Sequence, residues 1–189
     1  MLSAGAAALA LVLSACSGGG IEGGGGGTGF VAGSDGIATV KKGQRDAAPE
    51  LSGKTVDGDE LDVASAYKGK IVVLNVWGSW CPPCRAEADD FVKVSKDLAG
   101  QDVQFVGINT RDGSTRPAKA FQEEFKVTYP SLYDPTGKLL LRFAKGTLNP
   151  QLIPSTIVVD REGKLAARAQ QELNEELLRK MLKPILAEK

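Results

Sequence analysis

The stretch that decides the fold is KIVVLNVWGSWCPPCRAE, residues 70–87. It opens with KIVVLNVW, a nearly continuous apolar run that is typical of a central strand buried on both faces. Cys81 and Cys84 follow this run and are separated by two prolines. We predict that a helix begins at Pro82, because proline is tolerated in the first turn of a helix. The stretch therefore predicts a strand, a short loop and a helix, with a C-x-x-C pair where the helix begins.

The rest of the folded part alternates strand-like and helix-like patterns. We predict a hairpin within 51–63 around an Asp-Gly turn, strands over 103–109, 154–160 and 164–168, and helices over 82–99, 116–127 and 171–186. This order predicts an α/β fold, a sandwich with a mixed β-sheet, in one domain over residues 49–189.

The amino-terminal residues read differently. Residues 1–16 are apolar and uncharged, too short for a membrane-spanning helix of about 20 residues but suited to a secretory signal. Residues 13–16, LSAC, resemble a bacterial lipobox, which predicts a lipidated Cys16 after a signal peptide; the alternative is a buried cysteine in an apolar helix. Residues 17–48 are rich in glycine and predict a flexible tether of about 30 Å.

Composition excludes several classes of function. Lysine plus arginine and aspartate plus glutamate number 23 each, so the charge balance favours no nucleic-acid partner. The chain has no histidine, which removes the commonest metal ligand and the commonest general base. We therefore predict no metal and no cofactor, and chemistry carried by cysteine, carboxylate, lysine or backbone groups.

The pair at Cys81 and Cys84 has three interpretations. A zinc site needs two further ligands, and the only other cysteine is Cys16, beyond the predicted tether. A structural disulfide over so short a loop stabilises a fold only slightly. At the start of a helix, unpaired N–H groups and the helix dipole favour a thiolate. We therefore favour a redox pair, with Cys81 as the exposed nucleophile and Cys84 as the shielded resolving thiol.

Glu87 belongs to the same predicted helix. Counted from Cys84, the residues at spacings of three, four, three and four share one face of the helix: Glu87, Phe91, Val94 and Leu98. A glutamate on this apolar face should be partly buried, with its pKa raised by desolvation, and could exchange protons with Cys84. The alternative is a solvated glutamate that points outwards.

Pro154 precedes a predicted strand and has two interpretations. It either marks the start of the strand or forms a cis peptide bond that presents the Ile153 backbone to a substrate peptide. The local sequence does not choose between them. Trp80 and Pro82, which flank Cys81, are further candidates for contact with a substrate.

Residues 49–189 resemble the TlpA/ResA-like family of membrane-tethered, thioredoxin-fold disulfide reductases, part of the redoxin superfamily. The motif WCPPCRAE is a specific match, and Asn75 stands where this family commonly has asparagine. The resemblance implies a thioredoxin-like fold with a central mixed β-sheet flanked by helices, an N-terminal β-hairpin and an insertion over 110–130. It also maps the family's acid–base glutamate onto Glu87 and its cis-proline onto Pro154.

The resemblance further implies a task at the extracytoplasmic face of the bacterial cell membrane, with the protein held there by its lipid anchor. Such proteins keep cysteines of exported proteins reduced, for example those of apocytochrome c, and a transmembrane thiol-disulfide carrier supplies the electrons. The alternatives are an oxidase that forms disulfides in secreted proteins and a binding lipoprotein without enzymatic activity. A peroxiredoxin-like peroxidase is less favoured, because GSWC lacks the Pro-x-x-x-Thr-x-x-Cys arrangement of such enzymes.

Overall fold

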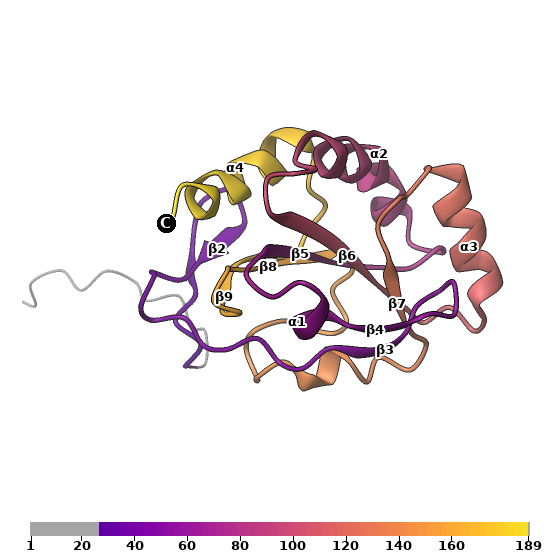
Figure 1. Cartoon of the computed structure of the whole chain (residues 1–189), viewed down its shortest axis with the longest axis horizontal. Coiled ribbons are helices and arrows are strands. Elements are labelled where there is room, and N and C mark those ends of the chain that lie inside the picture. Colours follow the sequence, from indigo (N-terminus) through magenta and orange to yellow (C-terminus); the bar gives the residue numbers. More distant parts are fainter. Residues whose placement is uncertain (1–26, 189) are drawn as a thin grey trace, which may run out of the picture.

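The computed structural model describes residues 27–188, shown in Figure 1. Within them the strands are β1 (Val31–Ala32), β2 (Ile37–Thr39), β3 (Ser52–Lys54), β4 (Glu60–Asp62), β5 (Ile71–Trp77), β6 (Val103–Thr110), β7 (Ser131–Asp134), β8 (Ser155–Val159) and β9 (Leu165–Ala169). The helices are α1 (Val63–Ala66), α2 (Pro82–Asp97), α3 (Thr115–Glu124) and α4 (Glu175–Leu186), with a 3-10 turn, η1, at Leu140–Arg142. The predicted signal peptide, the lipidation site Cys16 and residues 17–26 of the predicted tether lie outside this range.

Seven strands form one sheet in the order β1-β2-β9-β8-β5-β6-β7, and β3 pairs separately with β4. β5 pairs in parallel with β6 and antiparallel with β8, so the sheet is mixed as predicted. All seven residues of β5 are buried, which explains the continuous apolar run of its sequence. The β3–β4 pair is the predicted hairpin, with Gly58 in the left-handed region at its turn.

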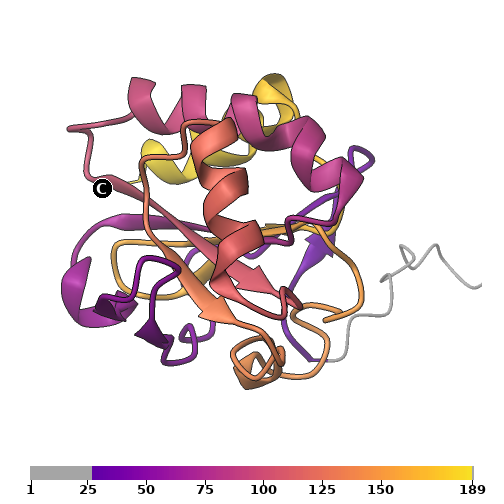
Figure 2. The ribbon, with the colours of Figure 1, turned by 90° about the vertical axis from the view of Figure 1, so that its right-hand side faces the viewer.

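The sheet is covered on both faces. Figure 1 shows α2 and α4 over one face and α1 with the β3–β4 pair below the other, while Figure 2 shows α3 beside the β7 edge. Alternate residues of β5 supply both cores: Ile71 and Val73 pack under α2 and α4, and Val72 and Leu74 pack on the opposite side. This alternation follows from the two-residue period of a strand.

The amino-terminal boundary of the folded part differs from the prediction. Ile37 pairs with Ala169, which adds β2 and β1 to the sheet beside β9. Phe30, Ile37 and Val40 are buried. The flexible tether is therefore wrong for the segment from Phe30 to residue 48, because these scattered apolar residues find their partners on a strand about 130 positions later in the chain.

Two further elements depart from the prediction. β7 was not expected, because its four residues are too few to show a period, yet it extends the sheet in parallel with β6. The last helix begins at Glu175 rather than residue 171, because the Asn174 side chain accepts a hydrogen bond from the Leu177 N–H and caps the helix there. No helix within residues 27–188 is both long and apolar enough to cross a bilayer.

Candidate active site

The C-x-x-C pair lies at the start of α2, after the short loop that follows β5. Cys81 is the N-cap of α2, with an extended backbone, and its Sγ accepts the Cys84 backbone N–H at 3.3 Å. Pro82 takes the first helical position, where its missing N–H costs no hydrogen bond. The Cys81 sulfur thus replaces the oxygen that a serine or aspartate cap would supply, and it faces the positive end of the helix dipole. That position favours a thiolate whenever Cys81 is reduced.

Cys81 and Cys84 are joined by a disulfide. Cys81 is 2% exposed and Cys84 is 1% exposed. The expectation of an exposed Cys81 beside a shielded Cys84 is therefore wrong for this oxidised form. The physical reason is the neighbouring segment, whose Ile153 carbonyl oxygen lies 3.7 Å from Cys81 Sγ and covers it.

The Ile153–Pro154 peptide bond is cis. β8 begins at the next residue, Ser155, which pairs with Val76 near the end of β5. This pairing brings the segment before β8 to the same end of the sheet as the cysteines. Pro154 is buried, and the Ile153 backbone turns toward Cys81. The sequence alone left this geometry open, because it depends on strand pairing across the chain.

Glu87 lies one helical turn after Cys84, on the face of α2 that also buries Phe91 and Val94. It is 1% exposed. Its Oε1 accepts the Asn75 side-chain amide at 2.8 Å, and its Oε2 accepts the Leu173 backbone N–H at 3.0 Å. Asn75 belongs to β5, and Leu173 lies just before α4, so one carboxyl group joins three parts of the fold.

Burial raises the pKa of Glu87 to about 8, despite the opposing effect of its two N–H donors. Desolvation outweighs the hydrogen bonds because the carboxylate would have no access to water. A group with such a pKa can both donate and accept a proton near neutral pH. Glu87 therefore has the chemistry expected of a proton-exchange partner for the dithiol, a role that stays a prediction.

Residues close in sequence to Cys81 and Pro154 expose apolar side chains at the surface. Trp80, directly before Cys81, is 48% exposed, and Leu152, two residues before Pro154, is 46% exposed. Pro82 is also exposed. The two segments that meet at the Cys81 sulfur thus each offer an apolar side chain to an approaching molecule. Their contact with a substrate stays a prediction.

Two residues beside this site were missed by the sequence analysis. Arg111 and Asp112 follow the last residue of β6, which is parallel to β5 and ends at the same edge of the sheet. The side chain of Asp112 accepts a hydrogen bond from the Ser79 backbone N–H, in the loop before Cys81. Their position in the sequence could have indicated that they belong to the site. Residues that follow neighbouring parallel strands lie at the same edge of the sheet, so residues after β6 are expected near those after β5.

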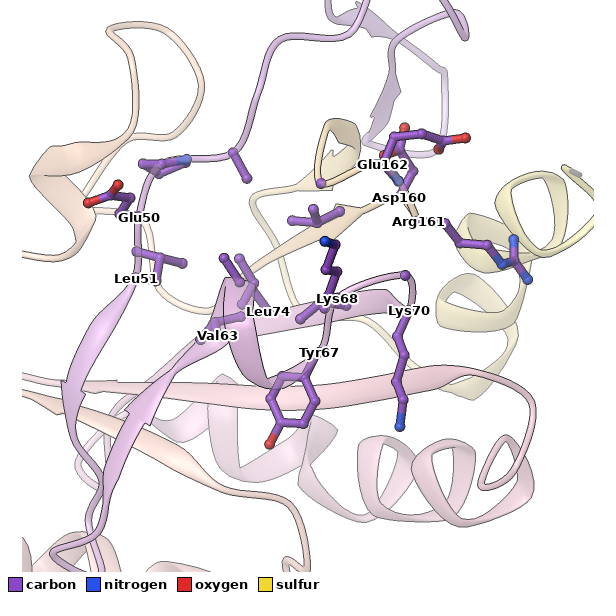
Figure 3. A pocket seen from close by; sticks show the side chains of 17 residues that line it. Glu50, Leu51, Val63, Tyr67, Lys68, Lys70, Leu74, Asp160, Arg161 and Glu162 are labelled. Atoms are coloured by element: carbon purple, nitrogen blue, oxygen red, sulfur yellow. The ribbon is translucent and has the colours of Figure 1, made fainter.

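The candidate site does not share residues with a cavity of about 450 Å³ that lies between α1 and the turn after β8. Figure 3 shows Leu51, Val63 and Leu74 around this cavity, with Arg161 pointing away from it. None of the predicted site residues lines it. Over residues 27–188, no group of three or more histidine, cysteine, aspartate or glutamate side chains could hold a metal ion.

Comparisons with known proteins agree with this geometry. The family model Redoxin matches residues 41–183. Thioredoxin-like protein YneN of Bacillus subtilis (strain 168) is 32% identical over 125 residues, which cover 66% of this chain and 68% of YneN. Thiol-disulfide oxidoreductase ResA of Geobacillus thermodenitrificans (strain NG80-2) is 30% identical over 118 residues, covering 62% of this chain and 64% of ResA. The chain thus spans about two thirds of the length of these two relatives.

A solved structure extends the similarity to the fold. A secreted thiol-disulfide isomerase from Corynebacterium glutamicum is 30% identical and superimposes with a TM-score of 0.75, covering 86% of this chain and 100% of that one. The expected thioredoxin-like fold is confirmed by this match. The chain belongs to the redoxin family, among its thioredoxin-fold thiol-disulfide oxidoreductases of the ResA type.

Proposed function

We propose that this protein reduces disulfides of exported proteins by thiol–disulfide exchange through Cys81 and Cys84, without a bound cofactor. The observation that carries the proposal is the position of the pair: the Cys81 sulfur caps α2 and lies 3.7 Å from the Ile153 carbonyl oxygen beside the cis-proline. A cap position favours the thiolate, and the adjacent backbone can pair with an extended substrate peptide.

The reaction proceeds in two exchanges. The Cys81 thiolate attacks one substrate sulfur, the substrate S–S bond breaks, and the other substrate sulfur leaves as a thiolate that takes a proton from solvent. Glu87, as carboxylate, accepts the proton of Cys84, and the Cys84 thiolate then attacks Cys81 in the mixed disulfide. The second substrate thiolate leaves and takes up a proton from solvent, which is replaced by the proton that Cys84 gave to Glu87. The substrate thus gains two electrons and two protons, and the enzyme pair becomes a disulfide.

Recharging the pair runs the same chemistry in reverse. A dithiol donor, which we propose to be a transmembrane thiol-disulfide carrier, attacks the Cys81–Cys84 bond through one of its thiolates. Cys84 leaves as a thiolate and takes a proton from Glu87, whose pKa of about 8 keeps it largely protonated at neutral pH. The first donor sulfur is then joined to Cys81 in a mixed disulfide. The second donor thiolate attacks the first donor sulfur, Cys81 leaves as a thiolate, and the donor ends as a disulfide.

The direction of electron flow is set by the reduction potential of the pair. The helix start stabilises the Cys81 thiolate and favours an oxidant, whereas the burial of Cys84, which is 1% exposed, disfavours a second thiolate and favours a reductant. We propose that the second effect prevails. Equilibration with a glutathione or dithiothreitol buffer should give a potential near that of thioredoxin, about −270 mV, and a value near −120 mV would make the protein an oxidase of secreted proteins.

Trapping distinguishes exchange from a binding function. In the Cys84→Ser protein the resolving step is lost, so mixed disulfides between Cys81 and substrate proteins should accumulate and disappear on addition of reductant. The Cys81→Ser protein is the matched control and should trap none. If the two variants behave alike in extracts of exported proteins, the chain is a binding protein whose dithiol is incidental.

We further propose that the protein works outside the cytoplasm, held at the cell membrane by a lipid on Cys16. The lipobox-like residues 13–16 support the anchor, and the Corynebacterium glutamicum neighbour is described as secreted. Cys16→Ala should move the protein from the membrane fraction to a soluble one and remove a lipid-sized mass increment. Retention in the membrane fraction would reject this anchor.

A further inference from the structure

Two surface segments meet at the Cys81 sulfur. The loop before Cys81 carries the half-exposed Trp80, and the segment before Pro154 carries the half-exposed Leu152. They touch where the Ile153 carbonyl oxygen lies 3.7 Å from Cys81 Sγ. Because the Cys81 sulfur is buried, a substrate polypeptide has to contact these two segments before it reaches the sulfur. The position of one segment relative to the other therefore determines whether the polypeptide can bind.

One guanidinium group joins both segments. Arg111 stands over the Trp80 indole, with its Cζ 6.0 Å from the ring centroid. Its Nη2 donates to the Pro150 carbonyl oxygen and, at 3.1 Å, to the Gln151 side chain. The planar fork of arginine suits this double task, since it can stack on an aromatic ring and donate within its plane.

The neighbouring residue holds the loop before Cys81 from the inside. Asp112 is 4% exposed, and its two carboxylate oxygens accept the Ser79 backbone N–H at 3.0 Å and the Ser79 hydroxyl at 2.5 Å. The Asn109 amide donates to the same carboxylate at 2.6 Å, and Tyr133 donates to the Asp112 backbone oxygen at 2.9 Å. The carboxylate that holds Ser79 is thus also bound to Asn109 of β6, and the Asp112 backbone is bound to Tyr133 of β7.

The arrangement requires an unusual backbone conformation at Arg111. Its φ is +60°, in the left-handed region that is unfavourable for a residue with a Cβ atom. This turn, directly after β6, leaves Arg111 exposed and the next residue, Asp112, buried. Backbone strain of this kind persists where surrounding contacts over-determine it, which is typical of functional surfaces.

We propose that the Arg111–Asp112 pair is a positioning device that fixes the loop before Cys81 and the segment before Pro154 as one surface, and that this surface selects polypeptide disulfides over small ones. The inference rests on the proposed thiol–disulfide exchange and extends it to the substrate class: a disulfide on an extended chain with an apolar side chain near the reactive cysteine. Arg111 and Asp112 act through Trp80, Ser79 and the segment before Pro154, and not on the sulfur itself.

The test compares two activated disulfides in a background that carries both Cys16→Ala and Cys84→Ser, where Cys81 is the only cysteine left. One probe is an extended peptide with a leucine next to a cysteine that carries thionitrobenzoate, and the other is mercaptoethanol with the same leaving group. Each reaction forms a mixed disulfide with Cys81 and releases coloured thionitrobenzoate. The ratio of the two second-order rate constants measures the advantage of the peptide and cancels any change in the nucleophilicity of Cys81.

Arg111→Gly is the decisive variant, because glycine tolerates the positive φ and so removes the side chain without strain. We expect the peptide advantage to fall about fivefold, from the loss of the stacking contact and the two hydrogen bonds. Asp112→Asn should lower it too, and the double variant should be no worse than the stronger single one, since both act on one surface. Exposed Arg116 on α3 gives the matched control, and Arg116→Ala should keep the wild-type ratio.

Tryptophan fluorescence gives a readout that folding alone would not change. The chain has only Trp77, which is 3% exposed, and Trp80. Acrylamide therefore reports mainly on Trp80, whose quenching and rotational freedom should rise in Arg111→Gly while the melting temperature is kept. An unchanged peptide advantage in that variant, or a wild-type protein without such an advantage, would overturn the inference. If Cys81 reacts with neither probe, the proposed function fails instead.

Discussion

Glu87 combines hydrogen bonding, burial and a raised pKa in one carboxyl group. Its two oxygens accept N–H groups from Asn75 and Leu173, and both donors favour the charged form. Its pKa is nevertheless raised to about 8, because burial removes the water that a carboxylate needs. The spacing from Cys84 was enough to place this residue on the buried face. The Leu173 backbone partner could not be foreseen, since it comes from a segment 86 residues away.

This burial makes stability depend on pH through Glu87. Below pH 4.5 the group is protonated in both the folded and the unfolded chain. As the pH rises, the unfolded chain releases its proton first, and above about 8 the folded chain holds a buried charge. The contribution of Glu87 to stability is therefore complete in acid and is lost as the pH rises toward and through 8, by roughly 1.4 kcal/mol per pKa unit.

Glu87→Gln tests this argument, because glutamine keeps the shape and cannot ionise. In urea titrations of the oxidised protein, whose cysteines do not titrate, the variant should exceed wild type by about 3–5 kcal/mol at pH 9. The two free energies of unfolding should converge toward pH 5. Asp89→Asn, an exposed change on the same helix, should follow the wild-type curve. Parallel curves for Glu87→Gln and wild type would show that Glu87 is not a buried titrating group.

At the scale of single elements, the sequence predicts those with a clear period and misses those that depend on distant partners. β5, β6, α2 and α3 show runs or spacings of their own and were placed within three residues of their observed ends. β1 and β2 have two and three residues, in a glycine-rich segment that reads as a tether. β2 becomes a strand of the sheet by pairing with β9, far along the chain, and β1 then pairs with β2.

Ile37 provides a test of whether the segment before residue 49 belongs to the fold. It is 6% exposed and packs in the core under α2 and α4, whereas Val31 in the neighbouring strand is 68% exposed. Ile37→Ala should lower the free energy of unfolding by roughly 2–3 kcal/mol, because it leaves a cavity in packed surroundings. Val31→Ala should stay within about 0.5 kcal/mol of wild type. If neither substitution changes the free energy of unfolding in urea titrations, the segment is a flexible tether after all.

Close packing of β6 against β7 and Trp77 also explains why residue 107 is a glycine. Gly107 in β6 lies opposite Ser131 of β7, and a Cβ atom there would come 2.6 Å from the Trp77 indole nitrogen and 2.2 Å from the Ser131 hydroxyl. Trp77 itself stacks on Phe121 of α3 at 4.3 Å, so the indole has little room to retreat.

Gly107→Ala should therefore destabilise the fold by about 1–3 kcal/mol through overpacking and change the near-ultraviolet circular dichroism of Trp77. Gly113→Ala is the matched control, since nothing lies within 4 Å of a Cβ atom there and its φ is not in the left-handed region. A silent Gly107→Ala would mean that β7 can move away from β6.

At the scale of the whole molecule, the two ends of the folded chain meet at one buried cation. Figure 1 shows the carboxyl terminus close to β2. Arg45, whose side chain is 4% exposed, binds Asp160 in the turn after β8 at 2.9 Å and Glu188 near the carboxyl terminus at 2.6 Å. Its Nε donates to the Val40 carbonyl oxygen. This cluster ties the amino-terminal strands, the sheet and the end of the chain together.

The contribution of such a charge cluster to the free energy of unfolding depends on how deeply its side chains are buried. Removing one partner of a buried pair leaves an uncompensated charge, so Arg45→Ala should lower the free energy of unfolding by about 3–5 kcal/mol. Lys42 and Glu162 form an ion pair nearby with side chains 46% and 51% exposed, and Lys42→Ala should cost less than about 1 kcal/mol. Urea titrations of both variants, at low and high salt, separate the two cases.

The origin of the cost can be tested with a second substitution. If Arg45→Ala is unstable mainly because Asp160 is left charged and buried, then Asp160→Asn should recover part of the loss in the double variant. The carbonyl oxygen of the substituted amide can still accept a hydrogen bond from the turn, where Asp160 now accepts the N–H groups of Glu162 and Lys164. A coupling free energy of about 1–3 kcal/mol between the two positions is expected. Additive losses would assign the effect to packing of the arginine stem instead of its charge.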